Sequence, residues 1–572
     1  MELHCELLLY LDKRRYFAKM KDDCENFLES LTEKTVSKFP SLRCFLEIDV
    51  MDVIDVLPSL GELIIKEPLK LQKMCNDVLF ACLRSIDVDN YKLVEYSQVV
   101  VVLRLKCVPR ILCLPNPKRY KGLTYFEGTL LAKSESVSYV YHTVWSCPED
   151  CEDSINIIHY IPKTPPKCCI CRSTMYENSG LRRCGDQVTA TFKLKGDYLL
   201  RKFYIVDDLI PKLKVGLYYA LHAIVGKSII IWSLEKIEQC KAPMTHPVPR
   251  DLDVLYNACN RSPWKFIYCL ASSLAINVCP LNCFIQLKIN LLLSLASIKA
   301  NVLTNSNILH VLATGFDTRF VGEIMNEAAK LTDKNILIGT SNTDVATALI
   351  AGTGGIAAFP LPLHAYNQKQ IFSVLSAIES GEIMNETSKT KLKCAVWAHG
   401  MDFKKIVMFN VASVFGNVCR GDHGEFNDNI VEYLLQGSIE PSGITEDELR
   451  ALKDISTYLS IVAGIEVELD KLPETLLRSY FLAARKERPR AVAISSMNSL
   501  ITVSLTSARL CRRSVVTIED AIFAIWLHVC GFPEPRFAPE EYLETPMNIR
   551  KLNKIMDGFK HWLEQFTGMS NL

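Results

Sequence analysis

Near the start of the chain, apolar residues recur every three or four positions, which is the spacing of helices that bury one face. One such series comprises Val53, Val56, Leu57, Leu60, Leu63 and Ile64. Pro68 opens a second series that continues to Ile86, and proline is favoured in the first turn of a helix. We therefore predict an N-terminal helical bundle over residues 1–117.

After Gly122 the apolar runs become shorter and fit strands better than helices. Four such runs, separated by glycine, proline and charged residues, span residues 123–132, 187–194, 218–225 and 228–234. We predict a small β-barrel over residues 118–240, interrupted by a cysteine-rich hairpin at residues 145–185.

Residues 241–252 contain Pro243, Pro247 and Pro249, so neither periodicity continues through them and a linker is predicted. From 253 to 440, helical runs alternate with short apolar runs, which is typical of an α/β domain with a parallel sheet. The predicted helices include 287–298 and 320–331, and the predicted strands are 308–314, 356–359 and 395–398.

Beyond residue 440 the pattern predicts helices only, over 476–485, 497–510 and 517–529, and Thr445 with Glu448 predicts a capping box for one more. Residues 441–572 are therefore expected to form a C-terminal helical domain. The predicted fold class is a multidomain α+β protein.

The charges nearly cancel, because 65 Lys and Arg face 64 Asp and Glu. A protein without an overall positive field can contact DNA only through local patches. The first twenty residues mix charged and apolar positions, unlike a signal peptide. The apolar run Leu291–Ile298 lies between Lys288 and Lys299 and is too short to cross a bilayer. We expect a soluble protein with no membrane partner.

Twenty-two cysteines in 572 residues are too dilute for a disulfide scaffold, so most are expected to be reduced thiols. Cys147 and Cys151 form one close pair and Cys168 and Cys171 another, which suggests a zinc ribbon because tetrahedral zinc takes four thiolates from two short loops. Three residues separate the first pair instead of the commoner two. Cys169, Cys184 and His159 are alternative ligands, and packed thiols without metal are the alternative to a site.

Several short motifs follow one another along the chain. They are Phe126-Glu127-Gly128 with Ser134, Ser273-Leu274-Ala275, Leu287-Lys288, Gly354-Gly355-Ile356, Tyr480 to Arg485, Ala508-Arg509-Leu510 and Val516-Thr517-Ile518-Glu519-Asp520. None is specific alone, but their order resembles the minichromosome maintenance (MCM) helicase family over nearly the whole chain. The resemblance implies an OB-like β-barrel with a zinc ribbon, a degenerate AAA+ ATPase-like α/β domain and a C-terminal helical lid.

The MCM helicases hydrolyse ATP at a P-loop, where glycines expose N–H groups to phosphate, a lysine reaches its oxygens and a hydroxyl binds magnesium. Here the strand 309–314 leads into Gly315-Phe316-Asp317-Thr318-Arg319-Phe320. Arg319 falls near the lysine position and Phe320 at the hydroxyl position, and the second glycine is missing. Gly315, Thr318 and Arg319 therefore mark a degenerate P-loop, and we assign no cofactor-binding residue.

Other parts of the ATP chemistry are replaced as well. Pro360-Leu361-Pro362 stands where the acidic pair belongs, Gly400 near the water-orienting asparagine, Val414 near the arginine finger and Ser495 near the lid arginine. We expect no ATP hydrolysis, no bound ATP and no catalytic residue. The intervals Gly315–Pro360 and Glu382–Lys393, which would carry the pore hairpins that grip DNA, look shortened.

The candidate DNA contacts are Lys193, Lys195, Arg201 and Lys202, with Phe203 or Tyr204 as stacking partners for bases. Solvated lysines at strand edges are the alternative interpretation. A second basic run comprises Arg485, Lys486, Arg488 and Arg490, although Glu487 and Pro489 favour an interdomain loop, and Arg512 and Arg513 either join it or cap a helix.

An intact scaffold with erased motifs resembles divergent, non-catalytic members of the family that are linked to meiotic recombination and double-strand break repair. The resemblance implies a nuclear factor that joins MCM-like proteins in a hetero-oligomer, on single-stranded or recombination-intermediate DNA. A weak ATP-dependent helicase subunit and a zinc-containing scaffold without DNA binding are the alternatives, and a monomer is the alternative to the hetero-oligomer.

Overall fold

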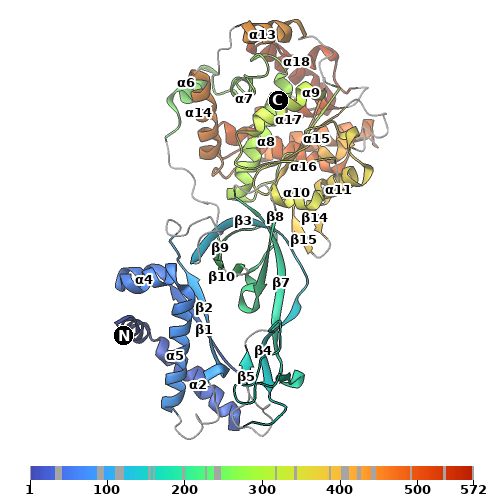
Figure 1. The fold of residues 1–572 in the computed structure, drawn as a ribbon. Coiled ribbons are helices and arrows are strands. Elements are labelled where there is room, and N and C mark those ends of the chain that lie inside the picture. Colours follow the sequence, from blue (N-terminus) through green and yellow to red (C-terminus); the bar gives the residue numbers. More distant parts are fainter. Residues whose placement is uncertain are drawn as a thin grey trace. The chain divides into compact units, whose positions relative to one another are not determined.

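The computed structural model describes residues 2–32, 41–86, 96–109, 122–151, 156–158, 161–195, 200–225, 229–237, 247–315, 318–340, 344–385, 388–400, 411–420, 427–439, 446–489, 492–532 and 536–569. The chain forms two compact units, Met1–Glu238 and Gln239–Leu572 (Figure 1). The predicted division into five segments is finer than these two units and stays a prediction.

Unit 1 begins with helices that pack on a two-stranded parallel sheet. The helices are α1 (Glu2–Lys13), α2 (Tyr16–Thr32), α3 (Val50–Val56), α4 (Pro58–Lys66) and α5 (Pro68–Ile86), and the strands are β1 (Leu42–Asp49) and β2 (Val99–Lys106). The prediction for residues 68–86 is confirmed. The prediction of helices alone is wrong at β1 and β2, where alternate residues such as Val99, Val101 and Leu103 are buried.

One edge of β1 is covered by α2. The Tyr16 hydroxyl donates to the Glu47 carbonyl at 2.6 Å, and the Lys19 ammonium donates to the Phe45 carbonyl. Among the described strands β1 pairs only with β2. Because an unpaired strand edge is a template for pairing with another chain, these donors protect it.

The second part of unit 1 is an antiparallel sheet with the strand order β10-β9-β3-β7-β4-β5, in which β8 also pairs with β7 and β6 with β4. The strands are β3 (Leu123–Lys133), β4 (Val137–Ser146), β5 (Asn156–Ile158), β6 (Tyr176–Glu177), β7 (Arg183–Leu194), β8 (Leu200–Val206), β9 (Tyr218–Val225) and β10 (Ile229–Lys236). All four predicted strands are confirmed, whereas β4 and β8 were not predicted. Phe126, Phe192, Phe203 and Leu221 belong to its apolar core.

Two arginines connect the parts of unit 1. Arg43 of β1 lies 2.9 Å from the Asp207 carboxylate and 4.0 Å from the centre of the Tyr141 ring. Arg104 of β2, which is buried, donates to both oxygens of Asp208 at 2.6–3.0 Å. These ion pairs attach the parallel strands to the short helix η5 (Asp207–Lys212) that follows β8.

Unit 2 contains a five-stranded parallel sheet with the order β12-β13-β16-β11-β17. Its strands are β11 (Val311–Thr314), β12 (Asn335–Leu337), β13 (Ile356–Ala358), β16 (Ala395–Gly400) and β17 (Val418–Arg420). Three of them match the three predicted strands, so the α/β prediction is confirmed. A separate hairpin, β14 (Glu382–Asn385) and β15 (Ser388–Lys391), occupies the interval predicted to be a shortened loop.

The helices of unit 2 cover this sheet and continue beyond it. They are α6 (Arg250–Ala258), α7 (Pro263–Ser272), α8 (Ile285–Thr304), α9 (Thr318–Ala329), α10 (Val345–Ala351), α11 (Gln368–Ser380), α13 (Asn427–Ile439), α14 (Glu446–Val462), α15 (Lys471–Glu487), α16 (Ile494–Leu510), α17 (Ile518–Gly531) and α18 (Ile549–Thr567). The predicted C-terminal helices are confirmed, but Thr445 lies outside the described residues. Since α6 begins at Arg250, the end of the predicted linker is helical.

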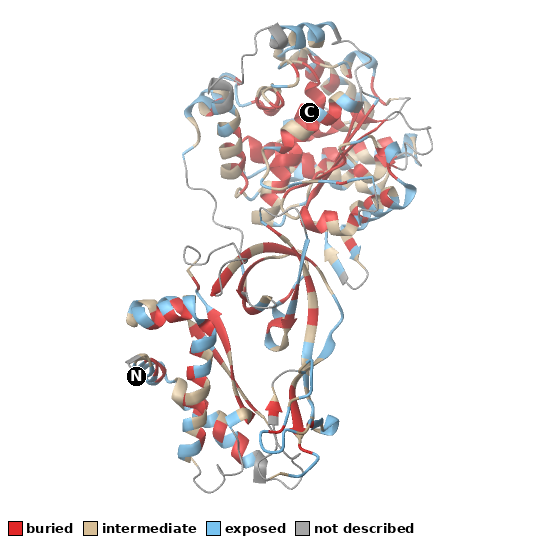
Figure 2. Ribbon diagram, in the orientation of Figure 1, coloured by how far each residue is buried: buried red, intermediate tan, exposed pale blue. Residues whose placement is uncertain are grey.

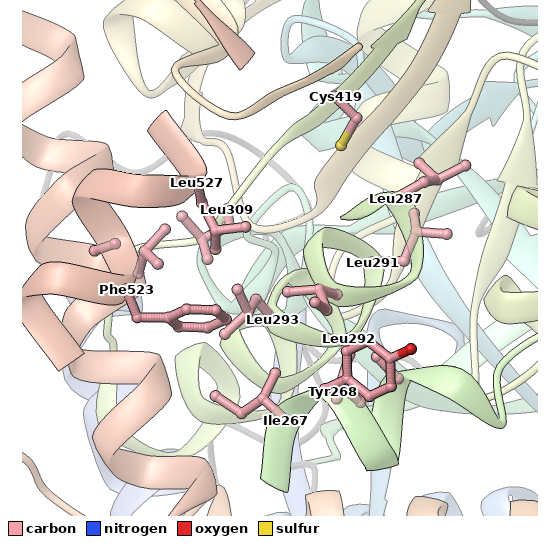
Figure 3. Close-up of a cluster of buried hydrophobic side chains, with 14 of the residues drawn as sticks. Ile267, Tyr268, Leu287, Leu291, Leu292, Leu293, Leu309, Cys419, Phe523 and Leu527 are labelled. Carbon is pink, nitrogen blue, oxygen red and sulfur yellow. The ribbon is translucent and has the colours of Figure 1, made fainter. Parts of the chain in front are cut away.

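The core of unit 2 is built around α8, which is buried on nearly all sides (Figures 2 and 3). Its leucines pack against Ile267, Phe523 and Leu527. Ser294 accepts from the Trp397 indole N–H at 2.8 Å and donates to the Leu309 carbonyl at 2.6 Å. Among the described helices only α8 is long and apolar enough to span a membrane, but 72% of its apolar window is buried, as in the central helix of a folded core.

Candidate functional site

Four cysteine sulfurs converge at one end of the antiparallel sheet. Cys147 follows β4, and Cys168 and Cys171 lie in the turn before β6. The Sγ atoms of Cys147, Cys151, Cys168 and Cys171 all lie within 4.8 Å of one another. Cys147 Sγ is 3.3 Å from Cys171 Sγ and 3.9 Å from Cys151 Sγ. Four sulfurs bound at about 2.3 Å from one zinc ion lie roughly 3.8 Å apart, so the arrangement fits a tetrahedral site.

The backbone around the second cysteine pair favours thiolates, which are the form that binds metal. The N–H of Ile170 donates to Cys168 Sγ at 3.4 Å. Backbone donors at Cys171 and Ile170 lower the pKa of Cys168, and hydrogen bonds from Ser173 lower the pKa of Cys171 to about 6. The pKa of Cys151 is raised to about 12, chiefly by its hydrogen bond to Cys171. Thiolate charge is therefore best supported at Cys168 and Cys171.

Very few apolar side chains support this end of the sheet. The local cluster consists of Trp145, Met175 and the sulfurs of Cys147 and Cys168, with Cys151 and Ile158 at its margin. The Trp145 indole donates to Thr143 Oγ1 at 3.0 Å. The four cysteines can bind a metal such as zinc, and a metal would be a main source of stability for so small a cluster.

The structure also separates the chosen cysteines from the alternatives. Cys169 and Cys184 are exposed, and neither belongs to the convergent group. Cys184 lies on β7 opposite Val140 of β4. His159 lies outside the described residues.

The loop predicted to be a degenerate P-loop lies at the carboxyl end of β11, where a parallel sheet commonly binds ligands. Gly315 has a φ of 76°, and α9 begins at Thr318. The Arg319 side chain is 91% exposed, with its Nε 3.7 Å from the Glu323 carboxylate. Phe316 and Asp317 lie outside the described residues.

The resemblance places a magnesium-binding hydroxyl at residue 320 and an acidic pair after β13. Both positions carry apolar residues. The Phe320 ring lies 5.5 Å from the Phe284 ring and packs against the core. At the end of β13, Phe359 is buried and is followed by Pro360 and exposed Leu361. A carboxylate is absent from the described segment 356–362. These residues carry no hydroxyl or carboxylate side chain that could bind magnesium.

Near the amino ends of the strands, two of the replaced positions lie close to each other. Val414 and Ser495 both line a cavity of about 650 Å³, together with Phe415 and His310. Ser495 Oγ donates to the Ser413 carbonyl at 2.7 Å. The cavity was not predicted, because its wall combines the amino ends of strands with one face of α16, and no local sequence motif encodes that arrangement.

The candidate DNA contacts lie on neighbouring strands. Lys202 of β8 is opposite Thr191 of β7, and Lys193 of β7 is opposite Leu200. Arg201 follows Leu200, while Lys195 lies just beyond β7 with its ammonium 3.7 Å from the Glu127 carboxylate. These residues share one hairpin, and whether they contact DNA stays a prediction.

The structure distinguishes the two proposed stacking partners. Phe203 is only 2% exposed and packs between Phe126 and Phe192, so it is not available to a base. Tyr204 is 61% exposed. Strand alternation explains the difference, because consecutive residues of β8 point to opposite faces.

Four of the other basic residues have structural partners. Arg488 lies 4.6 Å from the centre of the Phe537 ring, Arg512 pairs with Asp253 at 2.8 Å, and Arg513 pairs with buried Asp520 at 2.9 Å. Arg485 lies 5.9 Å from the Phe481 ring centre. Arg490 lies outside the described residues. The two arginines after α16 therefore anchor neighbouring segments of unit 2.

Comparison with known proteins agrees with the sequence resemblance. Residues 3–108 match the model of the MCMDC2 N-terminal domain. The chain is 22% identical to minichromosome maintenance domain-containing protein 2 of Rattus norvegicus, over 91% of this chain and 89% of the rat protein. It is 21% identical to the Homo sapiens protein of the same name, over 98% of this chain and 96% of the human protein. The chain is thus similar to minichromosome maintenance domain-containing protein 2 along almost its whole length, and its first hundred residues match the N-terminal domain of that protein.

Proposed function

We propose that the chain is a non-catalytic MCM-like factor in meiotic recombination and double-strand break repair. In this proposal it works in the nucleus as a subunit or adaptor beside MCM-like partners on DNA, and it holds zinc at the four cysteines. Similarity to minichromosome maintenance domain-containing protein 2 supports the family part of the proposal. The biological process is carried over from the resemblance of the sequence.

The proposal that the chain is non-catalytic rests on the residues that replace the ATP-binding and ATP-hydrolysing groups of the MCM helicases. ATP hydrolysis needs a cation at the phosphates, a hydroxyl for magnesium and a group that positions water. Phe320 has no hydroxyl, and its ring packs against Phe284. Arg319 is exposed beside Glu323, and Pro360 follows the strand that would end in carboxylates. We infer that this chain contributes surface rather than chemistry.

Persistence of the scaffold supports an assembly role. The residues of α17 and β11 are almost all buried, although the loop between β11 and α9 lacks its catalytic groups. A domain without a packing partner or a function would tolerate the gradual loss of such a core. We therefore propose that the AAA+-like α/β domain and its helical lid dock beside a catalytically active MCM-like neighbour.

The proposed DNA surface is the outer face of the β7–β8 hairpin in the OB-like barrel. Lys202 and Tyr204 lie two residues apart on β8, so both point to the same face, and both are exposed. A cation and an exposed aromatic ring are the pair that single-stranded nucleic acid uses for its phosphates and bases. The ion pair of Lys195 with Glu127 favours the alternative of a zinc-containing scaffold without DNA binding.

One preparation can test these parts together. The chain is purified with MCM-like proteins recovered from a germ-line nuclear extract, and ATP turnover and single-strand binding are measured over a range of salt. We expect the chain to co-purify with MCM-like proteins and to hydrolyse no ATP itself. We also expect its affinity for single-stranded DNA to fall as the salt concentration rises. A chain that remains monomeric with and without DNA contradicts the assembly model, and salt-independent affinity contradicts the DNA surface.

Two exposed tyrosines of unit 1 give a matched comparison. Tyr204→Ala is expected to weaken single-strand binding about tenfold, since stacking on one base contributes about 1–3 kcal/mol. Tyr176→Ala removes a ring of similar exposure from β6, 53% against 61%, and is expected to leave binding unchanged. Equal effects of both substitutions would contradict the proposed surface.

A further inference from the structure

Two thiols touch at the start of unit 2, far along the chain from the four-cysteine cluster. Cys259 follows α6, and Cys269 lies in the second half of α7. Their Sγ atoms are 3.9 Å apart. The turn between the helices contains Asn260 and Arg261 in the left-handed region, with φ of 54° and 58°, and α7 begins shortly after it at Pro263. Side-chain rotation would have to bring the sulfurs to about 2.05 Å for a disulfide.

The two thiols have different environments. The hydrogen bond from Cys269 lowers the pKa of Cys259 to about 7, and the Lys265 ammonium acts in the same direction while burial opposes both. The hydrogen bond to Cys259 and burial raise the pKa of Cys269. A thiolate and a protonated thiol in contact are the arrangement in which one sulfur attacks an oxidant and the other resolves the product.

Other cysteines of the same unit lack this combination. Burial raises the pKa of Cys394, Cys419 and Cys511 to about 12 in each case, so they remain protonated at neutral pH. Cys259 and Cys269, in contrast, have their sulfurs in contact. Cys269 is half-buried, whereas Cys259 is buried.

We propose that Cys259 and Cys269 form a modification site that a hydroperoxide converts into an intramolecular disulfide. The Cys259 thiolate attacks one peroxide oxygen, the O–O bond breaks, and Cys259 sulfenic acid and hydroxide form. The hydroxide takes the proton of Cys269, whose sulfur attacks the Cys259 sulfur and displaces the second oxygen as hydroxide, which is protonated to water. With hydrogen peroxide, the two thiols supply two electrons and two protons, and two water molecules leave.

The disulfide would fasten the first helix of unit 2 to the core. At present α6 is attached through buried Leu252, through the ion pair of Asp253 with Arg512 at 2.8 Å, and through Tyr256. The Tyr256 hydroxyl donates to the Cys511 carbonyl at 2.9 Å, and its ring meets the Phe266 ring edge-on at 5.0 Å. Cys259 lies one helical turn beyond Tyr256. Oxidation therefore adds a covalent link to these non-covalent contacts of α6.

Tryptic mapping of the full-length chain tests the proposal. Cleavage after Arg250, Arg261, Lys265 and Lys288 gives a peptide 251–261 with Cys259 as its single cysteine, and a peptide 266–288 with Cys269, Cys279 and Cys283. After treatment with hydrogen peroxide and blocking of free thiols, we expect these two peptides to be linked through Cys259 and Cys269, and dithiothreitol to separate them. Fragment spectra distinguish Cys269 from the other two cysteines.

Two further measurements keep the outcome decisive. In Cys269→Ser the resolving thiol is absent, so labelling of Cys259 by dimedone, which traps sulfenic acid, is expected to rise at least fivefold over the unsubstituted chain. Exposed Cys107 serves as the reference for a thiol that oxidises alone. Oxidation of Cys107 without any link between the two peptides in the unsubstituted chain would overturn the proposal, and so would a link through Cys279 or Cys283 instead.

Discussion

Substitution of one cysteine of the convergent group should release the metal and unfold the segment that carries it. In Cys171→Ser the sulfur that lies 3.3 Å from Cys147 Sγ is replaced by a hydroxyl that binds zinc poorly. We expect one zinc per chain in the unsubstituted protein and much less than one in the variant after exposure to a competing chelator.

The size of the effect follows from how little else holds this segment. Trp145 and Met175 are the large buried side chains of the local cluster, and burying both contributes only about 3–6 kcal/mol. A structural zinc site contributes an apparent ~10–16 kcal/mol near neutral pH. The stabilising free energy lost with the metal is therefore larger than the local apolar contacts can supply. The sheet core around Phe192 and Leu221 does not depend on the metal.

The assay combines metal analysis with limited proteolysis. Zinc is measured by mass spectrometry of the purified chain, and cleavage is mapped across residues 147–185. Cys169→Ser is the matched control, because Cys169 is exposed, adjacent to Cys168 and outside the group. We expect rapid cleavage within this segment only in Cys171→Ser. Retention of one zinc in Cys171→Ser, or its loss in Cys169→Ser, would refute the assignment of ligands.

Three other outcomes are expected. Arg319→Ala should still complement a null background, because an exposed ion pair contributes at most about 1 kcal/mol and no phosphate is expected at this loop. If function were lost, and were restored by Lys but not by Gln at this position, a bound phosphate would be indicated. Gly531→Ala should destabilise unit 2 by about 1–3 kcal/mol in urea unfolding, because the added Cβ would lie 2.0 Å from the Val418 carbonyl oxygen of β17, and unchanged stability would contradict this close approach. Burial lowers the pKa of His528 to about 4, so between pH 6.5 and pH 4 the native state binds fewer protons than the unfolded state and loses stability as the pH falls. At pH 4.5 this loss amounts to about 2–3 kcal/mol. Thermal unfolding of the unsubstituted chain and of His528→Gln, compared at pH 7 and pH 4.5, should show a smaller loss in the variant.

The sequence predicted elements well where one local pattern determines them. Strand 218–225 matches β9, and helix 320–331 corresponds to α9, because the period of apolar residues and the breaks at glycine or proline are local properties. The run 99–106 was misassigned to helix because strands buried in parallel pairs carry nearly continuous apolar sequence. Its partner β1 lies some fifty residues earlier, and that pairing depends on tertiary structure.

The same limit applies to the candidate sites. The spacing of Cys147, Cys151, Cys168 and Cys171 predicted the convergent group because each pair lies in a short turn. Phe203 was proposed as a stacking partner although the alternation of β8 turns it into the core, a signal that was present in the sequence and not used. The contact of Cys259 with Cys269 depends on the conformation of the turn between α6 and α7, which no local motif encodes.

The cover that α2 gives to β1 bears on how the chain can be shortened. A fragment that begins after residue 40 loses the Tyr16 hydroxyl and the Lys19 ammonium, and with them the donors to the carbonyls of Glu47 and Phe45. The strand edge would then be open along a segment rich in apolar residues, which is the usual start of intermolecular β-pairing. The N-terminal helices therefore protect the chain against self-association. A protein that begins after residue 40 should precipitate even though it keeps the four convergent cysteines and the whole of unit 2.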